Sequence, residues 1–250
     1  MKELDRMNAL VTGSGKGLGK EIALVLAEKG ADVIINDINE YDDVQDTLAG
    51  IRKLGRKAWF IKADVSNEEE VKAMFFHIEK EVGNIHILVN NAGTDRSNNI
   101  FSTSLDEWNH IISTNITSCF LCSKYAMQLM KENMFGRIVN ISSVAGQYGT
   151  LKGHVHYSST KSAMFGFTKT LARTGAPLGI NVNAVAPGLI ESELSRTTHG
   201  ADGLETLRKS IPLGLGTPRD VGLAVAFLCG EGSRYITGIS LDVNGGLYFR

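Results

Sequence analysis

Short apolar runs separated by helical patterns extend along the whole chain. Seven of these runs are four or five residues long, and as a group they lack strict polar alternation; they cover residues 8–12, 33–36, 58–61, 86–89, 137–141, 181–185 and 239–243. Strands of this kind are typical of a parallel sheet that is buried on both faces. The pattern therefore predicts about seven parallel strands.

The segments between the runs carry helical spacing. A helix predicted over residues 18–29 places Ile22 and Leu26 on one side. A later helix is expected to begin after Ser66 or Asn67, either of which can cap it, because acidic residues follow where the helix dipole favours them. Helices thus separate the predicted strands.

Strands that alternate with helices predict an α/β fold. Right-handed crossovers then give a Rossmann-type, doubly wound parallel sheet of about seven strands with helices on both faces. No linker, repeat or low-complexity tract interrupts the alternation, so residues 1–250 are expected to form a single domain. Ligands of such sheets bind at the carboxyl ends of the strands.

Composition and charge exclude several classes of protein. The chain has 250 residues, of which 43% are hydrophobic and 21% charged, as in an ordinary globular protein. A net charge of −1 gives no reason to expect nucleic acid or an anionic membrane as a partner. No apolar run reaches the roughly 18 residues of a spanning helix, and residues 1–7 are too polar for a signal peptide. The sequence predicts a cytoplasmic protein.

The cysteines and histidines do not indicate a disulfide framework or a metal site. Cys119 and Cys122 have the spacing of a redox motif, but they lie inside an apolar helical run, where buried hydrophobic side chains are expected. The six histidines lack paired ligand spacing, so no metal is predicted. His154 and His156 are interpreted as lining of a substrate pocket or as plain loop residues.

Tyr157 and Lys161 lie one helical turn apart. Tyrosine is a poor acid or base near neutral pH because its usual pKa is about 10. An ammonium group beside the phenol can stabilise the phenolate, so the pair could exchange a proton with an alcohol or carbonyl oxygen. Most pairs with this spacing are surface contacts, so the assignment depends on further motifs.

A glycine-rich loop between the first strand and the first helix supplies the next motif. Glycines there let the backbone approach a pyrophosphate, whose charge suits the helix N-terminus. The loop contains Gly13, Ser14, Gly15, Lys16, Gly17, Leu18 and Gly19. Its glycine spacing differs from the G-x-G-x-x-G fingerprint, but its position predicts a dinucleotide site.

The spacing from Thr12 to Gly19 is the T-G-x-x-x-G-x-G pattern of the short-chain dehydrogenase/reductase family. The other motifs of that family follow in order: N-N-A-G at 90–93, Asn115, Ser143, Y-x-x-x-K at 157–161, P-G at 187–188 and N-G-G at 244–246. The chain therefore resembles this family from residue 8 to residue 247, and most closely its 3-oxoacyl-carrier-protein reductase-like subgroup. Ser143 and Tyr157 are separated by fourteen positions, one more than is usual, and Ser192 replaces the usual threonine.

The resemblance implies a site and an activity. The implied catalytic residues are Asn115, Ser143, Tyr157 and Lys161: Tyr157 as the acid or base, Lys161 lowering its pKa, Ser143 binding the substrate oxygen, and Asn115 holding a water for proton supply. The implied cofactor contacts are residues 13–19 of the loop, Asp37, Asp64, Val65, Asn91, Ala92, Gly93, Tyr157, Lys161, Pro187, Gly188, Ile190 and Ser192. Hydride would pass directly between nicotinamide and the substrate carbon.

The cofactor is expected to be NAD, with NADP as the alternative. Asp37 follows the second strand, where a carboxylate accepts hydrogen bonds from ribose hydroxyls and repels a 2′-phosphate. Lys16 is the observation that favours NADP, because a cation in the loop could pair with that phosphate.

The expected substrate is a small-molecule ketone or secondary alcohol. The alternative is 3-oxoacyl-carrier-protein reduction, which is disfavoured because Met134 and Leu178 stand where such reductases carry basic residues, and because those reductases commonly use NADPH. A non-catalytic NAD-binding regulator is only a minor alternative, because such proteins usually lose the tyrosine or lysine and all four implied catalytic residues are present here. The pocket is expected to be bounded by Asp95, Arg96, Ser97, residues 147–156 and a lid at about 189–211.

The expected partners are further copies of the same chain. The helices predicted at 105–130 and 154–174 have more than one hydrophobic face, and the family commonly assembles through them, with residues 244–250 adding contacts. A homotetramer, or otherwise a homodimer, is therefore predicted.

Overall fold

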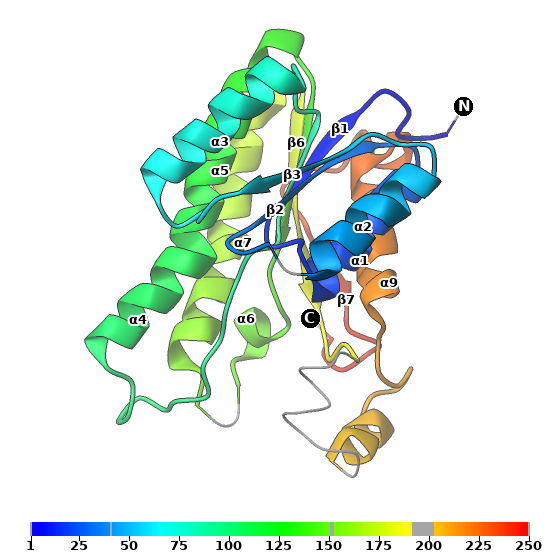
Figure 1. Cartoon of the computed structure of the whole chain (residues 1–250). Coiled ribbons are helices and arrows are strands. Elements are labelled where there is room, and N and C mark those ends of the chain that lie inside the picture. Colours follow the sequence, from blue (N-terminus) through cyan, green and yellow to red (C-terminus); the bar gives the residue numbers. More distant parts are fainter. Residues whose placement is uncertain (1, 41, 151–152, 192–202, 250) are drawn as a thin grey trace.

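A computed structural model describes residues 2–40, 42–150, 153–191 and 203–249. Its centre is one all-parallel sheet in the order β3-β2-β1-β4-β5-β6-β7 (Figure 1). The strands are β1 (Asn8–Val11), β2 (Asp32–Asp37), β3 (Ala58–Lys62), β4 (Ile87–Asn90), β5 (Gly136–Ile141), β6 (Ile180–Pro187) and β7 (Ser240–Val243). The doubly wound α/β sheet and all seven predicted strands are confirmed, with ends that differ by one or two residues.

Helices cover both faces of the sheet. They are α1 (Gly17–Glu28), α2 (Asp42–Lys53), α3 (Glu68–Glu81), α4 (Leu105–Ile112), α5 (Ser118–Met130), α6 (Ala145–Tyr148), α7 (Val155–Gly175) and α9 (Pro218–Cys229), and residues 203–210 are also helical. Helices α1, α2 and α9 pack on one face, and α3, α5 and α7 pack on the other (Figure 1). The strand order reverses between β1 and β4, which is where ligands of doubly wound sheets bind.

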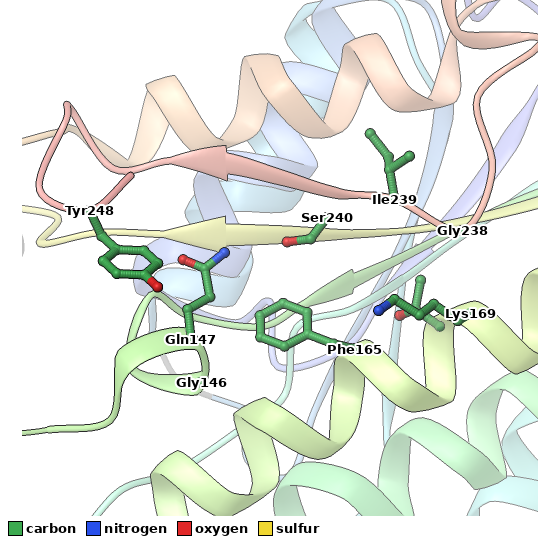
Figure 2. Close-up of a pocket in the computed structure, with 9 residues that line it drawn as sticks. Gly146, Gln147, Phe165, Lys169, Gly238, Ile239, Ser240 and Tyr248 are labelled. Carbon is green, nitrogen blue, oxygen red and sulfur yellow. The ribbon is translucent and has the colours of Figure 1, made fainter. Parts of the chain in front are cut away.

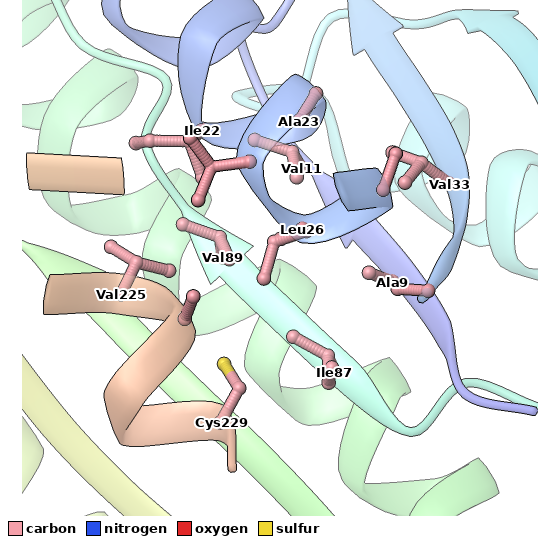
Figure 3. Packing of buried hydrophobic residues seen from close by; sticks show 14 of the residues in the cluster. Ala9, Val11, Ile22, Ala23, Leu26, Val33, Ile87, Val89, Val225 and Cys229 are labelled. Carbon is pink, nitrogen blue, oxygen red and sulfur yellow. The ribbon is translucent and has the colours of Figure 1, made fainter. Parts of the chain in front are cut away.

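The core beneath α1 and α9 is built from fully buried aliphatic side chains. Ile22 and Leu26 of α1 and Val225 of α9 pack against Val11 and Val89 of the sheet (Figure 3). Burying one such side chain contributes roughly 1.5–3 kcal/mol. The predicted helical face of residues 18–29 is therefore the face that anchors α1, and with it the glycine loop, to the sheet.

The opposite core contains Cys122, one of the three cysteines. Cys122 packs with Met74 and Phe75 of α3, and Cys119 lies one turn earlier on α5. Burial raises the pKa of the Cys119 thiol to about 12. The prediction that both side chains are buried is confirmed.

Within the described residues, no helix is both long and apolar enough to cross a membrane.

Candidate active site

The glycine loop connects β1 to α1 at the carboxyl edge of the sheet. Gly13 and Gly17 both have φ of +59°, a conformation that side-chain-bearing residues rarely adopt. A Cβ on Gly13 would lie 2.8 Å from the Cα of Ala92, and a Cβ on Gly19 would overlap the Gly13 carbonyl. Glycine at these positions is what lets the loop fold against the segment that follows β4.

Thr12 and Asn91 tie the loop to that segment. The Thr12 hydroxyl accepts hydrogen bonds from the backbone N–H groups of Asn91 (3.1 Å) and Ala92 (3.0 Å). Asn91 Nδ2 donates to the carbonyl oxygens of Thr12 and Gly13, each at 2.9 Å. The Asn91 side chain thus shapes the loop. Thr12 was not assigned a role from the sequence, although its position directly before Gly13 was a usable signal.

The N-terminus of α1 has neither a side-chain cap nor an acidic residue in its first turn. Helices α3, α4 and α9 are instead capped by the side chains of Asn67, Ser104 and Thr217. Uncapped N–H groups at the positive end of a helix dipole suit a phosphate. The residues present therefore fit the pyrophosphate of a nicotinamide dinucleotide.

Asp37 ends β2 beside this loop. Its Oδ2 accepts a hydrogen bond from Gly15 N–H at 2.9 Å, and its Oδ1 accepts one from Ile38 N–H at 2.8 Å. The side chain is almost buried, at 9% exposure of the residue. A carboxylate is thus fixed next to the loop, as the sequence predicts for the ribose-binding acid.

Asp64 and Val65 follow β3, which is the neighbour of β2 in the sheet. Asp64 Oδ1 accepts hydrogen bonds from the N–H (2.9 Å) and hydroxyl (2.7 Å) of Ser66. Val65 is buried against the core on the α3 face. Both residues lie at the same sheet edge as Asp37, and both shape the turn after β3.

Ser143, Tyr157 and Lys161 are brought together at the carboxyl end of β5. Lys161 Nζ lies 5.5 Å from the centre of the Tyr157 ring and donates a hydrogen bond to the carbonyl of Ile141 at 2.7 Å. The Ser143 side chain hydrogen-bonds the Tyr157 phenol, and its Oγ accepts from the N–H of Ala145 at 3.1 Å. Three of the four implied catalytic residues therefore form one cluster.

The pKa values in this cluster differ from the sequence expectation. The pKa of Tyr157 is raised to about 12, and burial is the largest cause. The hydrogen bond from Ser143 acts in the opposite direction, and the negative charge of Asp95 adds a smaller increase. Burial also lowers the pKa of Lys161 to about 8. The expectation that Lys161 lowers the tyrosine pKa is wrong for the chain by itself, because burial dominates and the lysine bonds the Ile141 carbonyl instead of the phenol.

Asn115 lies in a π-helical turn, Ser113–Thr117, that joins α4 to α5. Such turns occur frequently at functional sites. The helix predicted over 105–130 is therefore continuous but locally widened at Asn115. Periodicity alone gave no signal for this turn.

The buried Asn115 side chain is hydrogen-bonded to two segments beside the site. Its Oδ1 accepts from Thr94 N–H at 2.7 Å, and its Nδ2 donates to the Thr94 carbonyl (2.9 Å) and to Thr160 Oγ1 (3.1 Å). A Cβ on Gly93 would lie 3.3 Å from Asn115 Oδ1 and 3.6 Å from Lys161 Nζ. Asn115 and Lys161 thus both border Gly93, and the fourth implied catalytic residue joins the cluster.

The two histidines before Tyr157 bond carboxylates. His154 Nδ1 lies 2.7 Å from Asp95 Oδ2, and His156 Nε2 lies 2.8 Å from Glu107 Oε1. His154 is partly exposed, but His156 is fully buried in the first turn of α7. The interpretation of His156 as pocket lining or loop is therefore wrong, and Glu107 was missed. Among the described residues, no group of three or more potential ligands could hold a metal ion.

Pro187 ends β6, and Gly188 follows it in close contact with the segment after β7. A Cβ on Gly188 would lie 2.7 Å from the Cα of Asn244. Ile190 forms an isolated parallel bridge with Gly216. Ser192 and much of the lid expected at 189–211 lie outside the described residues.

A hollow of about 260 Å³ lies on another part of the surface, between α7 and β7 (Figure 2). Its lining includes Gln147 of α6, Phe165 and Lys169 of α7, Ser240 of β7, and Tyr248 near the C-terminus. Phe165 and Lys169 are one and two turns beyond Lys161 along α7. Ser143, Tyr157 and Lys161 do not line this hollow, so it is separate from the candidate catalytic cluster.

A buried polar network fixes the helices that carry the site. Asn90 Nδ2 donates to Ser123 Oγ (3.0 Å) and to Asn140 Oδ1 (2.8 Å), and Asn140 Nδ2 donates to Thr168 Oγ1 (2.9 Å). These four residues belong to β4, α5, β5 and α7. Because buried polar groups are costly when unpaired, the network defines one arrangement of α5 and α7 on the sheet.

Comparisons with known proteins agree with this geometry. Residues 13–248 match the family model described as enoyl-(acyl carrier protein) reductase. The 3-oxoacyl-(acyl-carrier-protein) reductase FabG of Vibrio cholerae is 41% identical over 241 residues, which cover 96% of each chain. The enzyme of the same name from Staphylococcus aureus strain Mu50 is 39% identical over 243 residues, covering 96% of this chain and 98% of that protein.

The solved structures include a close match in backbone. A candidate short-chain alcohol dehydrogenase from Sinorhizobium meliloti 1021 superposes with a TM-score of 0.92 at 33% identity. The superposition covers 98% of this chain and 97% of the other.

Proposed function

The chain belongs to the short-chain dehydrogenase/reductase family, and we propose that it uses NAD(H) to interconvert a 3-oxoacyl thioester and the matching 3-hydroxyacyl thioester. Membership makes it an oxidoreductase that acts on a ketone or secondary alcohol with a nicotinamide cofactor. The observation that carries the proposal is the cluster of Ser143, Tyr157 and Lys161. It lies at the sheet edge where the glycine loop leads into the uncapped N-terminus of α1.

The residues of the cluster have distinct proposed roles. Tyr157 donates its phenolic proton to the ketone oxygen in reduction and removes it in oxidation. Ser143 hydrogen-bonds the same oxygen and stabilises the charge that develops on it. Lys161, whose pKa burial lowers to about 8, can exchange protons near neutral pH, and Asn115 is proposed to hold the water that resupplies it. When bound, the nicotinamide supplies or accepts the hydride.

The proposed cofactor is NAD, and Asp37 supports this choice. Its carboxylate is fixed beside Gly15, where it would accept hydrogen bonds from the ribose hydroxyls and repel a 2′-phosphate. The remaining proposed contacts are the loop 13–19, Asp64, Val65, Asn91–Gly93, Pro187, Gly188, Ile190 and Ser192.

The relatives support the 3-oxoacyl substrate. Two proteins at 41% and 39% identity over nearly the whole chain are 3-oxoacyl-(acyl-carrier-protein) reductases. The apolar residues Met134 and Leu178 are a weaker objection than the sequence suggested. They flank the amino-terminal ends of β5 and β6, at the opposite sheet edge from Tyr157, so neither lies at the mouth of this chain's own site.

A small-molecule ketone or secondary alcohol is the second candidate, and Asp37 is the observation that favours it. An enzyme built for NAD is suited to oxidising alcohols, whereas carrier-protein reductases commonly use NADPH. This candidate shares the same catalytic cluster and differs in what fills the pocket.

One screen separates these candidates. Purified protein would receive NADH or NADPH with 3-oxoacyl thioesters of the carrier protein and of a small thiol, and NAD with polyols, hydroxysteroids and simple secondary alcohols. Thioester reduction with a clear preference for NADH supports the proposal. Idle thioesters with NAD-linked turnover of one alcohol class would select the second candidate, and a clear NADPH preference would refute the cofactor assignment.

We also propose that the chain assembles as a homotetramer, with a homodimer as the alternative. Leu105 of α4 and Phe120 of α5 are 73% and 50% exposed, and Phe249 near the C-terminus is 80% exposed. Apolar side chains gathered on the helices expected at the interface favour burial against another copy. A cytoplasmic location stays a prediction, which cell fractionation would test.

A further inference from the structure

The helix that carries Tyr157 begins without an ordinary N-cap. At the N-cap position, His154 has a left-handed backbone conformation (φ 60°), and its side chain makes no capping hydrogen bond. Its ring instead bonds Asp95. An N-cap side chain normally accepts from the amide of the second or third helical residue, and Tyr157 is the third residue of α7. The amide of the proposed proton donor is therefore left for another acceptor.

His156 provides that acceptor. Tyr157 N–H donates to His156 Nδ1 at 2.8 Å, and His156 Nε2 lies 2.8 Å from Glu107 Oε1. Because Nδ1 accepts the amide hydrogen bond, the ring proton is on Nε2, which donates it to the carboxylate. The imidazole is fully buried, and both of its nitrogens are paired.

Glu107 is itself held in place on α4. Its Oε2 accepts a hydrogen bond from Asn98 Nδ2 at 2.7 Å, and its backbone N–H donates to Ser104 Oγ at 3.1 Å. The hydrogen bond from His156 lowers the pKa of Glu107, which keeps the carboxylate ionised. The imidazole therefore rests on a fixed anion that belongs to a different helix.

The carbonyl of Tyr157 is tied to the same helical segment. It accepts a hydrogen bond from Thr160 Oγ1 at 2.8 Å, and Thr160 Oγ1 accepts one from Asn115 Nδ2 at 3.1 Å. Both main-chain polar groups of Tyr157 are thus bonded to side chains that α4 and its π-helical turn hold. The backbone of the proposed proton donor is restrained from two directions.

We propose that Glu107 and His156 form a positioning pair that holds the Tyr157 backbone, so that the phenol stays aligned with the substrate oxygen. The inference rests on the proposed role of Tyr157 as the proton donor. Misplacing a reacting group by 1 Å can cost about 10²-fold in rate. The pair contacts neither the glycine loop nor Asp37, so its loss is expected to reduce kcat while leaving NADH binding intact.

Three substitutions at one position test the pair. His156→Leu removes both contacts, His156→Asn keeps an acceptor oxygen near the position of Nδ1, and His156→Gln reaches only the position of Nε2. We expect His156→Leu to lower kcat by roughly 10- to 100-fold, with the Kd for NADH changed by less than about twofold. His156→Asn, which keeps the acceptor but loses the contact with Glu107, should recover part of the loss, and His156→Gln should not. His110→Leu, at an exposed position of α4, is the matched control and should retain full kcat.

The outcomes distinguish a positioning role of His156 from a general role in the stability of the fold. Unchanged kcat in His156→Leu overturns the proposal. Equal kcat loss in the Leu and Asn variants, or a parallel fall in NADH affinity and melting temperature, also overturns it. Tyr157→Phe is measured alongside: retained kcat there would refute the proton-donor role, whereas lost kcat there with unchanged kcat in His156→Leu would refute the positioning pair alone.

Discussion

At the scale of single residues, the central question is how a buried tyrosine could serve as the proposed proton donor. Burial raises the pKa of Tyr157 to about 12 and lowers the pKa of Lys161 to about 8, so burial makes proton loss harder for the phenol and easier for the ammonium. Ser143 counteracts the effect on the phenol through its hydrogen bond. The chain thus places a phenol with a raised pKa beside a lysine whose pKa of about 8 is close to neutral.

Replacing Tyr157 by phenylalanine tests the proposed acid directly. The ring remains, but no proton can be donated, so kcat is expected to fall at least about 10²-fold. NADH binding, followed by nicotinamide fluorescence, should stay intact because the glycine loop and Asp37 are unchanged. Near-full turnover in this variant would contradict the assignment.

Asp95 offers a test of the electrostatics. Its negative charge raises the pKa of Tyr157, so Asp95→Asn is expected to lower that pKa. In the oxidative direction the phenolate is the proposed base, and the rise of kcat with pH should therefore shift to lower pH. The control is His154→Asn, which disturbs the Asp95–His154 contact but keeps the carboxylate. A profile that moves to higher pH in Asp95→Asn would contradict the sign.

At the scale of elements, hydrogen-bonding side chains decide where helices begin. The sequence left Ser66 and Asn67 open as the cap of the helix that follows β3. In the structure Asn67 caps α3, accepting from Glu69 N–H (3.0 Å) and Glu70 N–H (3.3 Å), while Ser66 bonds Asp64. Helix α1, by contrast, starts uncapped, which is what suits it to a phosphate.

The two candidate caps can be compared by mutation. Asn67→Ala is expected to lower the free energy of unfolding by about 1 kcal/mol, the usual cost of losing a cap. Ser66→Ala, the matched control, should cost less because its hydroxyl bonds only the neighbouring turn. Urea denaturation of both variants would check this, and a larger loss in Ser66→Ala would contradict the cap assignment.

At the scale of the whole molecule, the parallel sheet collects the site from segments far apart in the chain. The carboxyl ends of β1, β2, β4, β5 and β6 deliver, in turn, the glycine loop, Asp37, the N-N-A-G segment, Ser143 and Pro187 to one edge. The helices behind that edge, α5 and α7, carry apolar surface that the single chain leaves partly exposed. This surface is the basis for the proposed assembly.

Two exposed phenylalanines test that assembly. Phe120 of α5 and Phe76 of α3 are 50% and 56% exposed, and each has a lysine four residues later. Phe120→Asp is expected to shift the protein from tetramer toward smaller species in light scattering at micromolar concentration. Phe76→Asp, outside the proposed contact, should leave the mass unchanged. A monomeric unmodified protein would refute the assembly itself.

Local patterns in the sequence were enough to predict the α/β sheet, its seven strands and the Tyr157–Lys161 pair. Apolar runs, glycine spacing and an i,i+4 pair are short-range features, and each has a physical cause that can be recognised within a few residues of sequence. The resemblance to a family added Ser143, Asn115 and Asp37, which the structure places at the same edge.

The remaining features depend on contacts between segments that are distant in sequence. The π-helical turn at Asn115 follows from its bonds to Thr94 and Thr160, and the burial of His156 follows from Glu107, forty-nine residues earlier. The pKa values of Tyr157 and Lys161 are set by burial, which no local pattern reports. Local chemistry thus indicated the candidate reacting groups, whereas packing between helices decided their pKa values and what holds them in position.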